Sequence, residues 1–218
     1  MKNTLNAIYV CVLLGFVVYH VTTQVTSKTN TTSSTTLPRL QSGDIIFQTS
    51  MSGQSMAIQL ATHSKYSHVG IIYQNGEEYF VYEAVQPVML TPLQDWIDRG
   101  VDSSYVIKRL LNANEVLTTQ TIGKMKAYGE QFSGRDYDLY FEWSDDKMYC
   151  SELVWKIYKE ATNIEIGKLE QLATFDLSSE LVQQTMKERY PNKIPLDELV
   201  ISPAAMFNSP LLKTIVSK

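Results

Sequence analysis

Cys150 is the residue of this chain best suited to covalent chemistry. It stands in "KMYCSELVWKIYK", where Leu153, Val154 and Ile157 share one face of the helix that their spacing predicts. Backbone N–H groups at a helix start carry partial positive charge and stabilise a thiolate, the form of cysteine that attacks carbonyl carbon. Three interpretations of Cys150 are open: a buried structural thiol, an intermolecular disulfide, or a nucleophile.

A cysteine nucleophile needs a base, and histidine is the usual one. His63 and His68 are the candidates, because His20 belongs to the N-terminal signal segment. His63 ends a predicted helix, where a partial positive charge is favourable for structural reasons alone. His68 begins a predicted strand on the face of Gly70 and Ile72, which leaves room for a substrate or a side chain to approach. The alternative for His68 is a histidine that only fills the core or the surface.

Glu83 is the third candidate, a carboxylate inside the apolar stretch "YFVYEAV" on the same strand face as Val81 and Tyr79. In a catalytic site it would orient the imidazole and stabilise its charged form. An ion pair with Lys or Arg of a neighbouring strand explains a buried carboxylate equally well. Other acidic residues lie before the cysteine and fit turns or helix caps: Asp136, Asp138, Asp145 and Asp146.

The strands that would carry these residues cluster in the first half of the chain. Alternation and β-branched content predict them at "GDIIFQ" from Gly43, "HVGIIY" from His68, "EYFVYEA" from Glu78 and "YVIKRL" from Tyr105. The pair Asn75-Gly76 is a strong hairpin signal between the second and the third.

Helical spacing predicts four helices, the longer ones in the second half. They are "SMAIQLATH" from Ser55, "TPLQDWIDRG" from Thr91, one long helix over about 114–132, and the cysteine helix from about Tyr149. In the second of these, Thr91 is expected as the N-cap, Pro92 as the first helical residue and Gly100 just past the end. Together the elements predict an α+β fold in which helices pack on an antiparallel sheet.

The N-terminus reads as an export signal. Lys2, the apolar run "AIYVCVLLGFVVY" and a polar tract follow in the order typical of such signals, although the run is short for a membrane span. We therefore divide the chain into a signal or uncleaved signal anchor (1–24), a Ser/Thr-rich tether (25–40) and one folded domain (41–218). The domain is expected outside the cytoplasmic membrane, in the periplasm or tethered to the outer face of that membrane.

Charge and cysteine content exclude several functions. The net charge is −4, or −5 without Lys2, and there is no basic cluster, so nucleic acid is not an expected partner. The two cysteines are Cys11, inside the apolar run, and Cys150, so a multi-cysteine zinc site is excluded once the signal is removed. We predict no metal and no cofactor.

Four motifs carry a resemblance to a known family: "SGDIIFQ", "AIQLATHSKYSHVG", "YEAVQPV" and "WSDDKMYCSELVWK". They resemble the YiiX/YebB-like family of the circularly permuted, NlpC-type papain-like superfamily, in which the histidine precedes the cysteine. The resemblance implies that Cys150 is the nucleophile, His68 the general base and Glu83 the third polar residue. It also implies that Tyr66 is an aromatic residue near the site that contacts substrate.

The same resemblance implies a cysteine amidase or peptidase. Relatives act on amide or ester bonds, so we expect hydrolysis of amides in cell-wall peptides through a thioester intermediate. Two alternatives are a lipid-directed acyl hydrolase or acyltransferase, and a periplasmic module that binds a peptide or an amino acid without turnover. The fold supports several reactions, so the substrate must be argued from the site.

Overall fold

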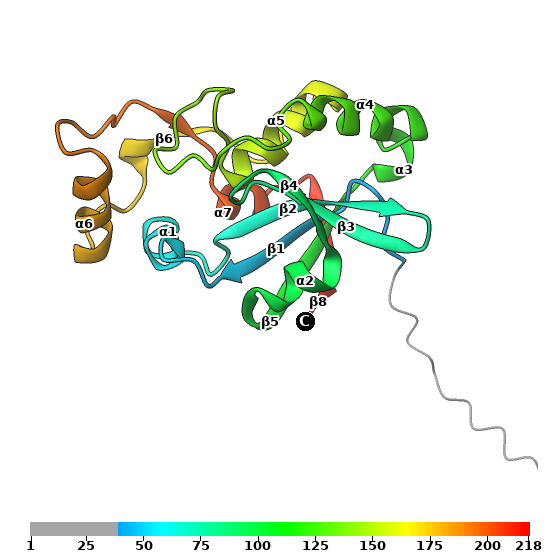
Figure 1. Ribbon diagram of the computed structural model, residues 1–218, viewed down its shortest axis with the longest axis horizontal. Coiled ribbons are helices and arrows are strands. Elements are labelled where there is room, and N and C mark those ends of the chain that lie inside the picture. The colour runs from blue at the N-terminus through cyan, green and yellow to red at the C-terminus, as the bar shows by residue number, and fades with distance from the viewer. Residues whose placement is uncertain (1–38) are drawn as a thin grey trace, which may run out of the picture. The chain divides into compact units, whose positions relative to one another are not determined.

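An antiparallel six-stranded sheet is the centre of residues 39–218, the part of the chain that this computed structural model describes (Figure 1). Its strand order is β4-β3-β2-β1-β5-β8, with β4 and β8 at the two edges. The strands are β1 (Ile45–Ser50), β2 (His68–Asn75), β3 (Glu78–Glu83), β4 (Met89–Pro92), β5 (Gly100–Leu110) and β8 (Leu212–Ser217). The α+β fold expected from the sequence is therefore confirmed.

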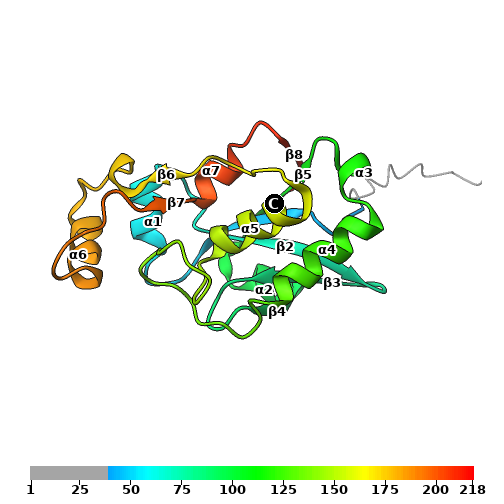
Figure 2. The ribbon, with the colours of Figure 1, turned by 90° about the horizontal axis from the view of Figure 1, so that it is seen from above.

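Helices cover both faces of this sheet. They are α1 (Ser55–Thr62), α2 (Leu93–Asp98), α3 (Ala113–Val116), α4 (Thr119–Glu130), α5 (Cys150–Thr162), α6 (Glu180–Arg189) and α7 (Pro203–Phe207). In Figures 1 and 2, α4 and α5 lie over one face, and α2 lies against the other. The fold is completed by a short two-stranded sheet, β6 (Glu170–Gln171) with β7 (Leu199–Val200), and by one turn of 3-10 helix, η1 (Leu172–Thr174).

Strand alternation divides the core into two layers. On the α5 side, Ile45, Phe47 and Ile71 pack with Leu153 and Ile157 of the cysteine helix. On the α2 side, the next residues along the same strands pack around the buried indole of Trp96; they include Ile46 and Ile72. The strand faces assigned from the sequence are thus confirmed, and α5 is held firmly against the sheet.

The hairpin signal is also confirmed. β2 and β3 pair from Ile71 with Tyr82 to Asn75 with Glu78. Gly76 in the connecting turn has φ +62°, a conformation that glycine adopts without the steric penalty of a side chain. This hairpin fixes the register that later brings His68 and Glu83 together.

The prediction of a single helix over about 114–132 is wrong. The chain forms α3 and α4 instead, separated at Leu117 and Thr118. Thr118 is in an extended conformation, and its hydroxyl accepts a hydrogen bond from the N–H of Thr121 at 3.2 Å. A threonine that caps a new helix therefore interrupts the helical pattern of the sequence.

The start of the helix expected from Thr91 is also wrong. Thr91 and Pro92 belong to β4, α2 begins at Leu93, and Gly100 opens β5. Pro92, with ψ 137°, is the residue that precedes the helix. Thr91 is not a cap because it pairs with Val81 of β3 and turns its hydroxyl to Glu83.

A second packing unit lies beside the sheet, where α1 meets α6 near β6 and β7 (Figure 2). Its small buried cluster comprises Ala57, Leu172, Val182 and Met186. No element after α5 was assigned from the sequence, so this part of the fold, including α7 and β8, is new information from the structure.

The predicted signal segment 1–24 and nearly all of the tether 25–40 lie outside the described residues. Between residues 39 and 218, none of the helices combines the length and the apolar character needed to cross a bilayer.

Candidate active site

The cysteine thiol lies at the start of α5, as the sequence predicts. Cys150 is the first residue of the helix and Tyr149 is its extended N-cap residue, with ψ 162°. The N–H of Tyr149 donates to the carboxylate of Glu152 at 3.4 Å, which helps to fix this helix end. Cys150 is 2% exposed, forms no disulfide, and lies within the positive potential of the helix start. Burial alone is compatible with a structural thiol, so the residues around Cys150 must show whether it is structural or a nucleophile.

The imidazole of His68 is the first of these neighbours. His68 begins β2, and its ring is nearly parallel to the indole of Trp96, with ring centroids 5.7 Å apart. Nε2 lies 2.6 Å from Oε2 of Glu83, and the thiol of Cys150 is near enough to the imidazole to raise the pKa of His68. Since Glu83 engages Nε2, Nδ1 is the nitrogen left to face the sulfur.

The carboxylate of Glu83 is completely buried and has three partners. Oε2 contacts His68, whereas Oε1 accepts from the Thr91 hydroxyl at 2.5 Å and pairs with the guanidinium of Arg99. Burial raises the pKa of Glu83, but His68, Thr91 and Arg99 together outweigh burial and hold the pKa below its ordinary value. Glu83 is therefore an anion at neutral pH.

The same contacts set the charge of the histidine. Burial lowers the pKa of His68, but the neighbouring Cys150 and Glu83 outweigh burial and raise the pKa from 6.5 to about 9. An imidazolium between a carboxylate and a sulfur favours the thiolate form of that sulfur. The geometry thus supports an imidazolium that lies beside the Cys150 sulfur and is oriented by a buried carboxylate.

Glu83 makes both of the contacts that the sequence left open as alternatives. Glu83 orients His68, and it also forms an ion pair with an arginine, Arg99, which follows α2 rather than lying within a neighbouring strand. His63, the other candidate base, lies away from this cluster. It ends α1 in a left-handed conformation, is largely exposed, and pairs with Asp176 at 3.1 Å.

The structure does not bring Tyr66 into the cavities beside Cys150 and His68. Its ring stacks on Phe207 of α7, with centroids 3.9 Å apart, and contacts the edge of Phe47. It is not among the described residues that line either cavity. Its contact with substrate stays a prediction, while its packing role is visible.

Three residues of the cluster were not found from the sequence: Thr91, Arg99 and Tyr137. A partner for the buried Glu83 carboxylate was expected, but nothing local pointed to Thr91 or Arg99 in particular. The phenol of Tyr137 lies near Cys150, and burial raises the pKa of the phenol well above the ordinary value. The phenol is therefore protonated at neutral pH and can donate to the sulfur. Tyr137 lies in a long loop without periodic pattern, so no sequence signal marked it.

Tyr137 belongs to a polar row that runs across the site. Its hydroxyl accepts from Nε2 of Gln54 at 2.8 Å, and Oε1 of Gln54 accepts from Arg189 at 2.8 Å. Gln54 precedes α1 and Arg189 ends α6, so the row links the second packing unit to the cysteine. We call Gln54, Tyr137 and Arg189 the polar row.

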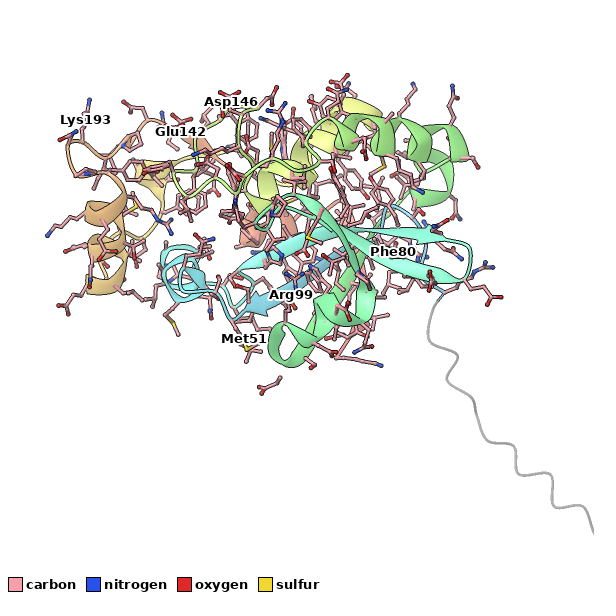
Figure 3. The ribbon with its side chains drawn as sticks, in the orientation of Figure 1. Met51, Phe80, Arg99, Glu142, Asp146 and Lys193 are labelled. Carbon is pink, nitrogen blue, oxygen red and sulfur yellow. The ribbon has the colours of Figure 1, made fainter. Side chains whose placement is uncertain are left out.

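Two cavities meet at the polar row. One is lined mostly by apolar side chains and reaches Cys150; the other is an open cleft that reaches His68 and Arg99. The three residues of the row line both. Met51 and Arg99, labelled in Figure 3, lie toward the end of the sheet where β1 finishes, and both line the open cleft. The reacting groups are therefore reachable from two sides of different polarity.

The Thr91 hydrogen bond supplies a stability prediction. Thr91→Val keeps the shape of the side chain but removes a donor from the buried Glu83 carboxylate, so we expect the free energy of unfolding to fall by about 1–3 kcal/mol. Urea denaturation measures it. Thr214→Val, at an exposed position of β8, is the matched control and should stay within about 0.5 kcal/mol of wild type. Equal stability of the two variants would show that Thr91 does not support Glu83.

Comparison with known proteins finds a family and relatives that this chain resembles over most of its length. Residues 39–216 match the family described as permuted papain-like amidase enzyme, YaeF/YiiX, C92 family. The chain is 46% identical over 178 residues to the uncharacterized protein YiiX of Escherichia coli strain K12, covering 82% of this chain and 87% of that protein. It is also similar to a crystal structure described as metalloprotein yiiX from Escherichia coli O157:H7, with a TM-score of 0.78, 46% identity, and coverage of 82% of this chain and 97% of that one.

Proposed function

Because this chain belongs to the permuted papain-like amidase family, we propose that Cys150, His68 and Glu83 are its catalytic residues and that it hydrolyses amide bonds. The observation that carries the proposal is the imidazole of His68, which lies beside the Cys150 thiol and is hydrogen-bonded to the buried carboxylate of Glu83. A thiol buried only for packing needs no imidazolium beside it, nor a carboxylate behind that imidazolium.

The geometry supports a two-step reaction. In acylation, the Cys150 sulfur bonds to the acyl carbon, the C–N bond breaks, and the leaving amine takes the proton carried by His68. In deacylation, water gives a proton to His68, and the water oxygen bonds to the acyl carbon. The C–S bond then breaks and returns the thiolate. N–H groups of the first turn of α5, the turn that carries Cys150, would stabilise the oxyanion of both steps.

The solved relative from Escherichia coli O157:H7 is described as a metalloprotein. In the described part of this chain, no group of three or more His, Cys, Asp and Glu side chains is placed to hold a metal ion. The donor atoms of Glu83 are taken up by His68, Thr91 and Arg99. These residues do not fit a metal centre, so the reaction above uses none.

Two substrate classes are candidates. Cell-wall peptides are proposed because the N-terminal segment predicts export, which would bring residues 41–218 to them outside the cytoplasmic membrane. Substrates with a long acyl chain are favoured by a separate observation, the apolar cavity at Cys150.

Product analysis tests the proposal. The full chain and its Cys150→Ala variant are incubated with muropeptides, N-acyl amino acids and phospholipids, and products are followed by mass spectrometry. Cysteine-dependent release of an amine, together with an acyl adduct on Cys150, is the expected result. Tight retention of a ligand without any product would replace the proposal with a binding module, and transfer of the acyl group to an added amine would identify an acyltransferase.

The pH profile supplies a further prediction. Leaving-group protonation needs the imidazolium of His68, so activity should fall as pH rises through about 9.

The fold raises the pKa of His68, so the contribution of His68 to the free energy of unfolding is fully present below about pH 6.5. That contribution is lost as pH rises through about 9. Glu83→Gln removes a charge that holds the proton, so the alkaline limb of kcat/KM should move to lower pH.

Rate measurements across the neutral and alkaline range check this prediction, with NMR titration of the imidazole as a second readout. An alkaline limb that stays in place in a folded Glu83→Gln variant would remove Glu83 from the catalytic set.

A further inference from the structure

The indole of Trp96 lies against the imidazole of His68, and the reaction described so far gives it no role. Trp96 belongs to α2 and is fully buried. The two rings are stacked, with centroids 5.7 Å apart and an angle of 23° between their planes. Trp96 therefore turns a ring face, rather than an edge, toward the proposed general base.

The packing around the indole leaves it little freedom to move. Trp96 is part of the core layer on the α2 side, where it packs with Ile46, Ile72 and Val81. These three side chains come from β1, β2 and β3, which are neighbours in the sheet. His68 lies on the same face of β2 as Ile72, so an indole that is fixed in this layer also restricts the plane of the imidazole.

The indole N–H of Trp96 is buried without a hydrogen-bond partner among residues 39–218. A buried donor that lacks an acceptor opposes folding, and a phenylalanine ring would pack here without that cost. The favourable interactions of Trp96 must therefore come from its ring faces. Indole has the face that attracts cations best among the aromatic side chains, and the attraction acts within about 6 Å of the ring centroid.

The group stacked on this face is a cation. Burial lowers the pKa of His68, but the neighbouring Cys150 and Glu83 raise it to about 9, so the imidazole is charged at neutral pH. Glu83 lies on β3 and Cys150 begins α5, so both act on the ring nitrogens from elements other than α2. The other charged and titratable side chains that line the open cleft with His68 are Arg99, Tyr137 and Arg189.

We propose that Trp96 is a positioning residue for His68, whose indole face stabilises the imidazolium by a cation–π contact and holds the imidazole in its working plane. In that plane Nε2 contacts Glu83, and Nδ1 is left to face Cys150. Trp96 acts only through His68 and does not touch the reacting atoms. The inference deepens the proposed function and rests on it for the role of His68, but the contact between the rings can be tested without a substrate.

NMR titration of the His68 imidazole in the full chain is the first test. Trp96→Leu should lower the pKa of His68 by about 0.4–1.5 pH units, the shift that a partly to fully desolvated cation–π contact supplies. Trp155→Leu is the matched control, because Trp155 is also buried with an unpartnered indole N–H, but its ring contacts Trp143. This control should keep the wild-type pKa. An unchanged pKa of His68 in a folded Trp96→Leu variant would overturn the proposal.

Fluorinated tryptophan tests the contact without removing the indole from the core. Ring fluorines withdraw electron density from the indole face and weaken its attraction for a cation. Full chain labelled with mono-, di- and trifluorotryptophan should show a stepwise fall in the pKa of His68. The same labels in a Trp96→Phe chain should give no steps, because only Trp143 and Trp155 then carry fluorine. A constant pKa across the labelled wild-type series would refute the contact even if Trp96→Leu does not fold.

Reaction rates separate this inference from the proposed function. In Trp96→Leu the alkaline limb of kcat/KM for amide hydrolysis should move to lower pH by the same amount as the pKa of His68, whereas Trp155→Leu should leave the limb in place. A lowered pKa in a chain that shows no cysteine-dependent hydrolysis would refute the amidase but keep the contact. Cysteine-dependent hydrolysis with an unmoved limb and an unmoved pKa would keep the amidase and refute the role of Trp96.

Discussion

Replacement of Cys150 by serine should reduce kcat/KM for amide hydrolysis at least about a thousandfold, the scale seen when an enzyme loses its nucleophile. The helix start and the imidazolium of His68 favour a thiolate, but they do not ionise a serine hydroxyl to a comparable extent. The side chain is small and buried, so the fold should be kept.

Steady-state rates and circular dichroism of the Cys150→Ser and Cys150→Ala variants check this expectation. Alkylation by iodoacetamide also shows directly whether the thiol of residue 150 is present, because Cys150 is the sole cysteine among residues 39–218. A variant that keeps more than about a tenth of the wild-type rate would show that another group attacks the substrate.

His68→Gln should lower kcat/KM for amide hydrolysis by about a hundredfold to ten-thousandfold, the usual contribution of a general acid and base. The amide of glutamine can hold a hydrogen bond to Glu83 but carries no proton that it can exchange with sulfur and leaving group. Alkylation of Cys150 at neutral pH should slow as well, since the cation that stabilises the thiolate is lost.

His63→Gln is the matched control for His68→Gln. His63 is a largely exposed residue at the end of α1 and pairs with Asp176 rather than with Glu83. Its replacement should change neither the rate nor the alkylation. If both variants behave alike, the base is some other residue, and the contact between His68 and Cys150 is structural only.

The parts of the site that could be predicted from the sequence are those with a short-range signal. Cys150 stands at a helix start, and Glu83 interrupts an apolar strand. Strand alternation, a period of two, gave the face of each residue within its own strand. The pairing of Ile72 with Val81 in the structure shows that the two faces are one. The resemblance of four motifs to a known family then supplied the roles.

The remaining parts depend on contacts that local patterns do not contain. Arg99 contacts Glu83 because α2, which Arg99 follows, packs against the sheet. Thr91 was predicted to cap a helix, but its hydroxyl donates to the Glu83 carboxylate instead. The apolar cavity is assembled by α1, α6 and β7, which are far apart in the chain. A helical pattern near α6 would not have shown that its apolar side chains line the same cavity as Cys150, since periodicity predicts the apolar face of a helix but not the element that packs on it.

The two outermost strands of the sheet bear on how copies of this protein behave at high concentration. An unpaired strand edge can add a strand from another molecule, which leads to aggregation, and short edges, proline and lysine oppose it. β4 is four residues long and ends in Pro92, which has no N–H to donate. β8 carries the exposed Lys213 and is followed by Lys218. Both edges thus resist sheet extension, so copies of this protein are protected against association through their strands.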